Sequence, residues 1–78
     1  MVRTMINELL FFKKLGVNIK NLRFERGLSR SKIARLSGLR NNFLKRIENG
    51  KALKLKPFHL LILASVFELK LSEFFNGI

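Results

Sequence analysis

Residues 29–50 read SRSKIARLSGLRNNFLKRIENG, and this stretch decides the fold that the sequence predicts. Ser29 is a residue type that caps helix N-termini, so a helix is expected over about 30–37. Gly38 interrupts the helical spacing, and a second helix is expected over about 41–48, ended by the Asn-Gly pair that follows it. Two short helices joined by a turn therefore form the centre of the predicted structure.

Helical spacing recurs on both sides of this stretch, whereas the alternation typical of strands is weak. Three further helices are expected, over about residues 17–26, 57–67 and 72–76. Residues 1–15 are expected to be an N-terminal arm with a helical turn or two, and residues 16–78 to be the folded domain. The predicted fold class is all-α, a compact five-helix bundle around a helix-turn-helix.

The charge of the chain is large and uneven. Its 78 residues include 16 Lys and Arg against five acidic residues, a net charge of +11, and no Cys. Nearly all of this charge lies in residues 20–56, whose only acidic residues are Glu25 and Glu48. Such a block predicts a polyanionic partner, and nucleic acid and an anionic membrane surface are the two candidates.

Four segments resemble the Cro and phage-repressor type of helix-turn-helix domain, also called the Xre family. These segments are LGVNIKNLRFERGLS, KIARLSGL, LKRIENGK and LLILASVFELKLSEFF, within residues 15–75. The resemblance implies a five-helix bundle that binds operator DNA, usually as a dimer. It therefore favours a sequence-specific transcriptional regulator that acts on double-stranded DNA as a homodimer, such as a repressor or a restriction–modification controller protein.

The helix expected over 41–48 has two unlike sides. Leu44 and Ile47 lie on one side, and a polar set lies roughly opposite. Asparagine can bond adenine and arginine can bond guanine through two hydrogen bonds each, so the polar side suits the major groove. The resemblance places the base contacts at Arg40, Asn41, Asn42, Lys45 and Arg46.

Phe43 lies at the edge of this helix, and two interpretations are open. The ring can pack beside Ile47 on the core, or it can contact a thymine methyl group.

Further cations flank this helix. Arg30 and Lys32 lie in the first turn of the preceding helix, where a positive charge is unfavourable because it opposes the helix dipole. A phosphate bound near this helix end would offset the repulsion. The other phosphate contacts are expected at Asn49, Lys51, Lys54 and Lys56. Contacts of this kind position a protein on DNA and carry no sequence information.

Arg23 and Glu48 are expected to form a structural ion pair. Arg23 shares the apolar stripe of its helix, and Glu48 lies only about 40° from Leu44 on the inner side of its own helix. Two inward charges of opposite sign are expected to pair, because an unpaired buried charge is strongly destabilising.

The C-terminal third of the chain is apolar and nearly neutral. Its hydrophobic residues can fill the core of one chain or form an interface between two. We expect a dimer interface at Phe67, Leu69, Leu71, Phe74 and Phe75.

Other functions and partners fit the sequence less well. An enzyme is not expected, since the chain has no Cys, no Asp and a single His, and no metal, cofactor or small-molecule effector is predicted. The apolar runs are too short for a signal peptide or a membrane span, which favours a cytoplasmic protein. The alternatives are an antitoxin that binds a partner protein through its N-terminal arm, and a non-specific basic binder of nucleic acid or membrane surfaces.

Overall fold

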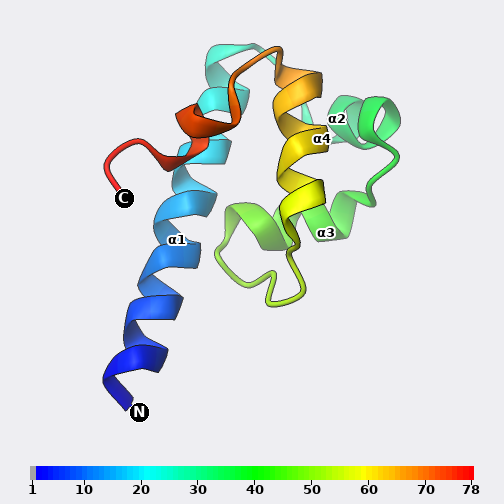
Figure 1. Cartoon of the computed structure of the whole chain (residues 1–78). Helices are drawn as coiled ribbons and strands as arrows, with labels where there is room; N and C mark the ends of the chain where they lie inside the picture. The colour runs from blue at the N-terminus through cyan, green and yellow to red at the C-terminus, as the bar shows by residue number, and fades with distance from the viewer. Residues whose placement is uncertain (1) are drawn as a thin grey trace.

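The computed structural model describes residues 2–78, and the side chains of residues 7–78. It contains four α-helices and a short 3-10 helix, and no strand occurs among the described residues (Figure 1). These elements are α1 (Val2–Glu25), α2 (Arg30–Ser37), α3 (Asn41–Glu48), α4 (Pro57–Phe67) and η1 (Leu71–Phe75). The prediction of an all-α fold is confirmed, whereas the prediction of five α-helices is wrong. The last element is a 3-10 helix of five residues, a geometry used for short pieces of chain.

Helix α1 is much longer than the sequence predicts. The expected helix started near residue 17, but α1 runs without a break for 24 residues from Val2. Residues 2–25 contain no proline, and their single glycine, Gly16, continues the helix. The N-terminal end of α1 therefore extends away from the rest of the fold as part of one long helix (Figure 1).

Local sequence signals position α2 and α3 as expected. The Oγ of Ser29 accepts a hydrogen bond from the backbone N–H of Lys32 at 3.1 Å, which caps α2. Gly38 ends α2 in the left-handed region at φ 76°, and its N–H bonds the carbonyl oxygen of Ala34. This is the conformation that favours glycine after a helix, and it turns the chain into α3.

A close contact between backbones fixes α1 on α3. A Cβ atom at Gly16 would collide with the carbonyl oxygen of Ile47 and lie 2.7 Å from that of Glu48. One turn earlier, Lys13 of α1 lies against Gly50, where a Cβ atom would come within 2.7 Å of the Lys13 Cα. Helix α1 therefore crosses the C-terminal end of α3 at a distance that only glycine permits.

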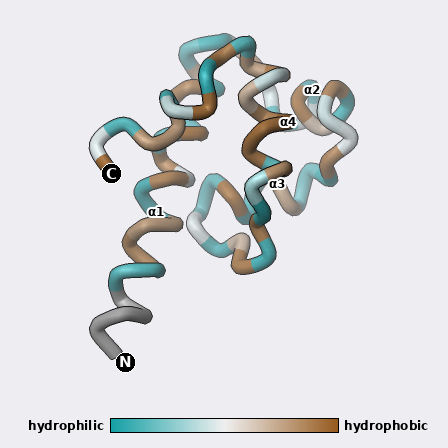
Figure 2. Tube along the Cα trace, in the orientation of Figure 1, coloured by the Kyte–Doolittle hydropathy of each residue, from teal (hydrophilic) through white to brown (hydrophobic). Residues whose placement is uncertain are grey.

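The hydrophobic core lies where all four helices and η1 meet. The largest fully buried side chains are Phe67, Phe74, Leu15, Ile33 and Leu63. Helix α4 is hydrophobic along most of its length (Figure 2), which predicts burial on most sides. The structure buries Leu60 and Leu63 but leaves Phe58 and Leu61 more than half exposed, so that prediction holds for one side of α4 only.

Candidate nucleic-acid interface

Helix α3 separates its side chains into a buried face and an exposed face. Leu44, Ile47 and Glu48 are buried where α3 packs on α1 and α2. On the other side, Asn42 and Arg46 are exposed to solvent. The helix can therefore remain anchored in the fold while its exposed face contacts a partner.

A groove of about 490 Å³ lies along this exposed face. The residues that line it are Arg40, Asn42, Phe43, Lys45, Arg46 and Asn49. The structure thus brings together four of the five side chains expected at DNA bases, and adds one expected phosphate contact, Asn49. Five of these six residues are cations or amides, which suits the phosphates and base edges of DNA.

Asn41 lies beside this groove instead of lining it. Its Nδ2 donates a hydrogen bond to the Oγ of Ser31 at 3.2 Å, which joins the start of α3 to the first turn of α2. The residue before it, Arg40, is the N-cap of α3 in an extended conformation. The exposed Asn41 side chain is thus oriented by α2 at the edge of the groove.

The residues expected at phosphates lie at separate places around α3. Arg30 and Lys32 are in the first turn of α2. Lys51 and Lys54 follow α3 and line a second groove of about 310 Å³, which shares Phe43 and Arg46 with the first. These two lysines therefore extend the cationic surface beyond the end of α3.

Lys56 lies apart from the other lysines of this loop. It lines an apolar groove of about 310 Å³ that is bordered by Phe11 and Phe12 of α1 and by Phe75 of η1. The structure therefore does not group Lys56 with the side chains that line the two grooves beside α3.

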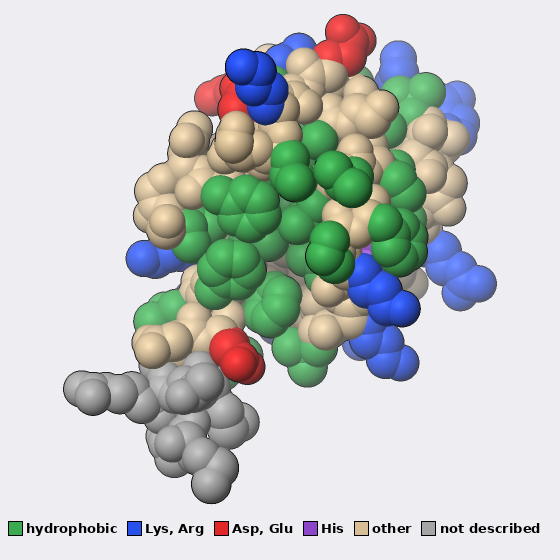
Figure 3. Space-filling view, in the orientation of Figure 1, with side chains coloured by type: hydrophobic (Ala, Val, Ile, Leu, Met, Phe, Trp, Pro, Cys, Tyr) green, Lys and Arg blue, Asp and Glu red, His purple; other side chains and the backbone are tan. Residues whose placement is uncertain are grey.

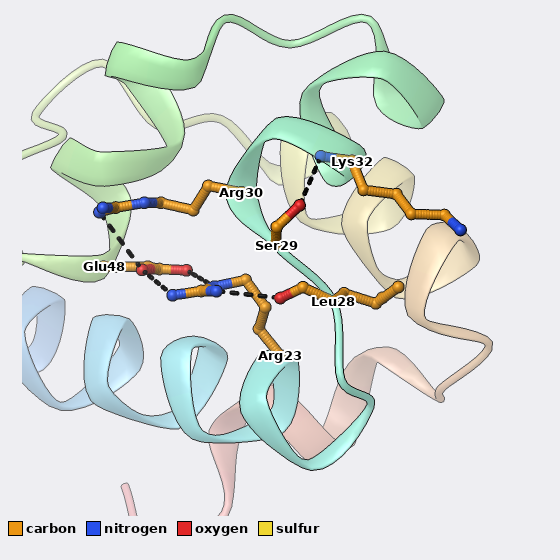
Figure 4. A network of polar contacts seen from close by, with 6 residues as sticks. All are labelled: Arg23, Leu28, Ser29, Arg30, Lys32 and Glu48. Atoms are coloured by element: carbon orange, nitrogen blue, oxygen red, sulfur yellow. Dashed lines mark hydrogen bonds and ion pairs between the residues drawn. The ribbon is translucent and has the colours of Figure 1, made fainter.

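Arg23 and Glu48 form an ion pair in the interior. The Nε of Arg23 lies 2.6 Å from Oε2 of Glu48, and Nη2 lies 3.1 Å from Oε1. The third nitrogen, Nη1, donates to the carbonyl oxygen of Leu28 at 2.9 Å (Figure 4). Only 8% and 4% of the two side chains are exposed, so the pair joins α1, α3 and the turn before α2.

Arg30 is the second cation near this carboxylate. Its Nη1 lies 3.8 Å from Oε1 of Glu48, and 36% of its side chain is exposed. Figure 4 shows the Arg30 side chain extending from α2 toward Glu48. Arg23 already neutralises Glu48 through two hydrogen bonds. The positive charge of Arg30 is therefore left over from this group of three, and it lies at the surface.

The structure corrects part of the expected dimer interface. Phe67 and Phe74 are 1% and 0% exposed, and their rings pack edge to face with centroids 5.7 Å apart. Both are core residues of one chain, because the packing of η1 on α4 covers them. The remaining three, Leu69, Leu71 and Phe75, are only partly buried.

The sequence offered no signal for an aromatic cluster beside α3. The rings of Phe43 and His59 meet edge to face with centroids 4.7 Å apart, and the ring centroids of Phe58 and His59 lie 4.2 Å apart. The Nδ1 of His59 accepts a hydrogen bond from the backbone N–H of Lys56 at 3.0 Å. Burial, and then the charge of Lys56, lower the pKa of His59 below its usual 6.5, which favours the neutral form of the ring.

The comparison that decides the family is a match of the helix-turn-helix family model HTH_3 to residues 19–74, more than half of the chain. The chain belongs to this helix-turn-helix family. The family consists of DNA-binding regulators and not of enzymes, in agreement with the sequence. Among curated proteins, no significant match is found.

Two solved structures resemble this helix-turn-helix chain. One is an HTH_3 family transcriptional regulator from Vibrio cholerae, with 33% identity over 90% of this chain and a TM-score of 0.82. The other is the restriction–modification controller protein C.AhdI from Aeromonas hydrophila, with 28% identity over 81% of this chain and a TM-score of 0.76. The chain spans 39% of the Vibrio regulator and 94% of the controller protein.

Two further observations concern other kinds of site. Among residues 2–78, no helix combines the length and the apolar character that a membrane span requires. In the same part of the chain, no cluster of three His or acidic side chains is placed to hold a metal ion.

Proposed function

We propose that this chain is a transcriptional regulator that binds a specific sequence of double-stranded DNA through α3. The observation that carries the proposal is the division of α3 into a buried side and an exposed side. Leu44 and Ile47 hold the helix in the core, while Arg46 and its polar neighbours line an open groove. An anchored helix with a polar outer face is what the major groove admits.

The exposed side chains of α3 have the chemistry to distinguish base pairs. Asn42 can bond the N6 and N7 of adenine, and Arg46 can bond the O6 and N7 of guanine. Lys45 can reach guanine or a phosphate. We therefore assign base contacts to Asn42, Lys45 and Arg46, with Arg40 and Asn41 at the N-terminal edge of the same surface.

Phosphate contacts account for the cations on either side of α3. We expect Arg30 and Lys32 to contact phosphates near the start of α2, and Asn49, Lys51 and Lys54 to contact phosphates near the end of α3. Lys56 is the weakest member of the set, since it lines a different groove. Several such contacts give an affinity that falls steeply with salt, with a log–log slope of about −0.9 for each phosphate.

We also propose that two copies bind a palindromic operator. Hydrophobic side chains gather on the face where α1, α4 and η1 meet (Figure 3), around the groove lined by Phe11, Leu71 and Phe75. An exposed apolar face of this kind is typical of an interface. A two-fold dimer places its two recognition helices about 34 Å apart, one turn of DNA.

The dimer is tested by the mass of the protein in solution. Size-exclusion chromatography with light scattering at micromolar concentration is expected to give twice the 9.1 kDa of one chain. A mass of one chain under these conditions would contradict the dimer.

A controller role is the more specific candidate within this function. The likeness extends over 94% of the controller protein from Aeromonas hydrophila, but over only 39% of the Vibrio regulator. A role of this kind predicts genes for a methyltransferase and an endonuclease beside the gene for this chain.

Binding of the DNA upstream of its own gene tests the proposed function. A gel shift with that duplex, in the presence of excess random duplex, is expected to show a specific complex. Specific binding of this class is typically about 10³-fold or more tighter than non-specific binding. Equal affinity for both duplexes would reject sequence-specific regulation and favour a non-specific basic binder.

A further inference from the structure

We propose that Phe43 reads the 5-methyl group of a thymine in the DNA site. The inference rests on the proposed function, because it requires α3 to enter the major groove. It adds an apolar specificity contact to the polar contacts of α3, and it names one base that the site must contain.

Phe43 lies at the boundary between the buried and the exposed face of α3. Its ring packs partly against the hydrophobic core and also lines both grooves beside the helix. At about 100° per residue, Phe43 lies about 40° from Ile47 and about 60° from Arg46 around the helix axis. One part of the Phe43 ring therefore packs on the core, and another part faces the grooves. The two interpretations that the sequence left open are thus compatible.

The neighbours of Phe43 hold its ring in place. His59 meets it edge to face, with ring centroids 4.7 Å apart. His59 is itself fixed, since its Nδ1 accepts the hydrogen bond from the N–H of Lys56. The part of Phe43 that faces the groove is therefore a preorganised apolar surface.

The composition of the groove indicates what this surface contacts. Of the described residues that line the groove along α3, Phe43 alone is apolar. A molecule that fits this groove must therefore combine negative charge and polar base edges with a small apolar group that meets Phe43. The methyl group of thymine is the apolar group on the major-groove edge of DNA, so a duplex with thymine beside the base read by Arg46 fits this groove.

Phe43 also disfavours cytosine at the same position. Cytosine lacks the methyl group and presents its N4 amino group in the major groove. Against a phenyl ring that donor has no acceptor, and an unsatisfied donor at a desolvated contact weakens binding.

Replacing thymine by deoxyuridine tests the inference on the unmodified protein. This change removes one methyl group and leaves the hydrogen-bonding groups of the base in place. With each thymine of the bound site replaced in turn, one position in the half-site is expected to lose affinity about fourfold, the effect of one buried methyl group. If no position responds while the protein still prefers its site over random duplex, this inference fails and the proposed function stands.

The variant Phe43→Ala assigns the methyl contact to this ring. It is expected to bind the thymine and deoxyuridine sites equally at the sensitive position. Phe58→Ala is the matched control, because Phe58 is exposed and packs on His59 without lining either groove beside α3. The control is expected to keep the fourfold difference. An equal difference in Phe43→Ala and in the unmodified protein would overturn the inference.

A photochemical measurement decides the case in which Phe43→Ala does not fold. With 5-iodouracil at the sensitive position, irradiation of the complex with the unmodified protein is expected to join the DNA to Phe43, located by mass spectrometry. A cross-link to a different residue would overturn the inference. A protein that does not distinguish any site from random duplex would overturn the proposed function and this inference together.

Discussion

Arg23 of α1 holds Glu48 of α3 through two hydrogen bonds, of 2.6 and 3.1 Å, across 25 residues of sequence. Because both side chains are buried, each charge depends on the other. The pair fixes the C-terminal end of α3 on α1, and with it the direction in which the exposed face of α3 points. The ion pair therefore supports α3 and makes no proposed contact with DNA. Arg30, which lies between Glu48 and the surface, is the partly exposed cation next to the pair.

Removing Glu48 tests this support. Glu48→Ala leaves the buried Arg23 without its partner, and loss of one member of a buried pair lowers the free energy of unfolding by about 3–5 kcal/mol. Urea unfolding followed by circular dichroism measures the change. Glu25→Ala is the control, because Glu25 is exposed on α1, and a change within about 0.5 kcal/mol is expected there. Equal stability of both variants would show that the pair does not hold α3.

The contact between α1 and α3 predicts a second loss of stability. In Gly16→Ala the new methyl group meets the carbonyl oxygens of Ile47 and Glu48, and neither backbone can move without separating the helices. We expect the free energy of unfolding to fall by about 1–3 kcal/mol. Asn21→Ala, on the exposed side of α1, is the control. If Gly16→Ala is as stable as the control, the two helices are not held at this distance.

Much of the fold follows from local signals that the sequence displays. Ser29 and Gly38 cap α2 as residues of their types do elsewhere, and the spacing of Leu44, Ile47 and Glu48 marks the inner side of α3. Arg23 and Glu48 could be expected to meet because each lies among apolar residues of its own helix. These inferences succeed because they depend on helix periodicity and on the high energy of an unpaired buried charge.

The features that sequence reasoning missed depend on contacts between distant segments. The close approach at Gly16 exists only because α1 crosses α3, and nothing in residues 2–25 alone shows it. In the sequence alone, Phe67 and Phe74 cannot be distinguished from interface residues. Only the packing of η1 on α4 shows that they are buried within one chain. The apposition of Phe43 and His59 joins residues from two helices and has no local signature.

The burial of His59, with the nearby charge of Lys56, predicts a pH dependence of stability. The lowered pKa of His59 means that the folded protein binds the proton more weakly than the unfolded chain, whose value is near 6.5. The contribution of His59 to the free energy of unfolding is therefore fully present above the unfolded-state pKa. It is lost as the pH falls through 6.5 toward the folded-state pKa. Unfolding in urea at pH 7.5, 6.5 and 5.5 measures it.

His59→Gln is the matched variant for this prediction. A glutamine at the third position of a helix can accept the same backbone N–H through its amide oxygen, and it does not titrate. The variant is expected to lose less stability than the unmodified protein between pH 7.5 and 5.5. The same loss in both proteins would exclude His59 as the titrating group.

The cations after α3 predict a particular change in salt dependence. If Lys51 and Lys54 each neutralise one phosphate, replacing either by alanine lowers the steepness of the log–log salt dependence of DNA affinity by about 0.9. Each variant also binds specific and random duplexes more weakly, by similar factors. Lys70→Ala is the control, since Lys70 precedes η1 and lines neither groove beside α3. Fluorescence anisotropy at several salt concentrations gives the slopes, and an unchanged slope in both variants would remove these lysines from the interface.

Helix α3 is expected to present Asn42, Lys45 and Arg46 to a duplex while its other side stays in the core. Nuclear magnetic resonance of the ¹⁵N-labelled protein locates the binding surface when the specific duplex is added at a salt concentration that suppresses non-specific binding. The largest shifts are predicted for residues 40–49, including the side-chain amide of Asn42, with little change at the buried Phe67. Shifts confined to α1 and η1, with α3 unaffected, would show that α3 is not the helix that binds DNA.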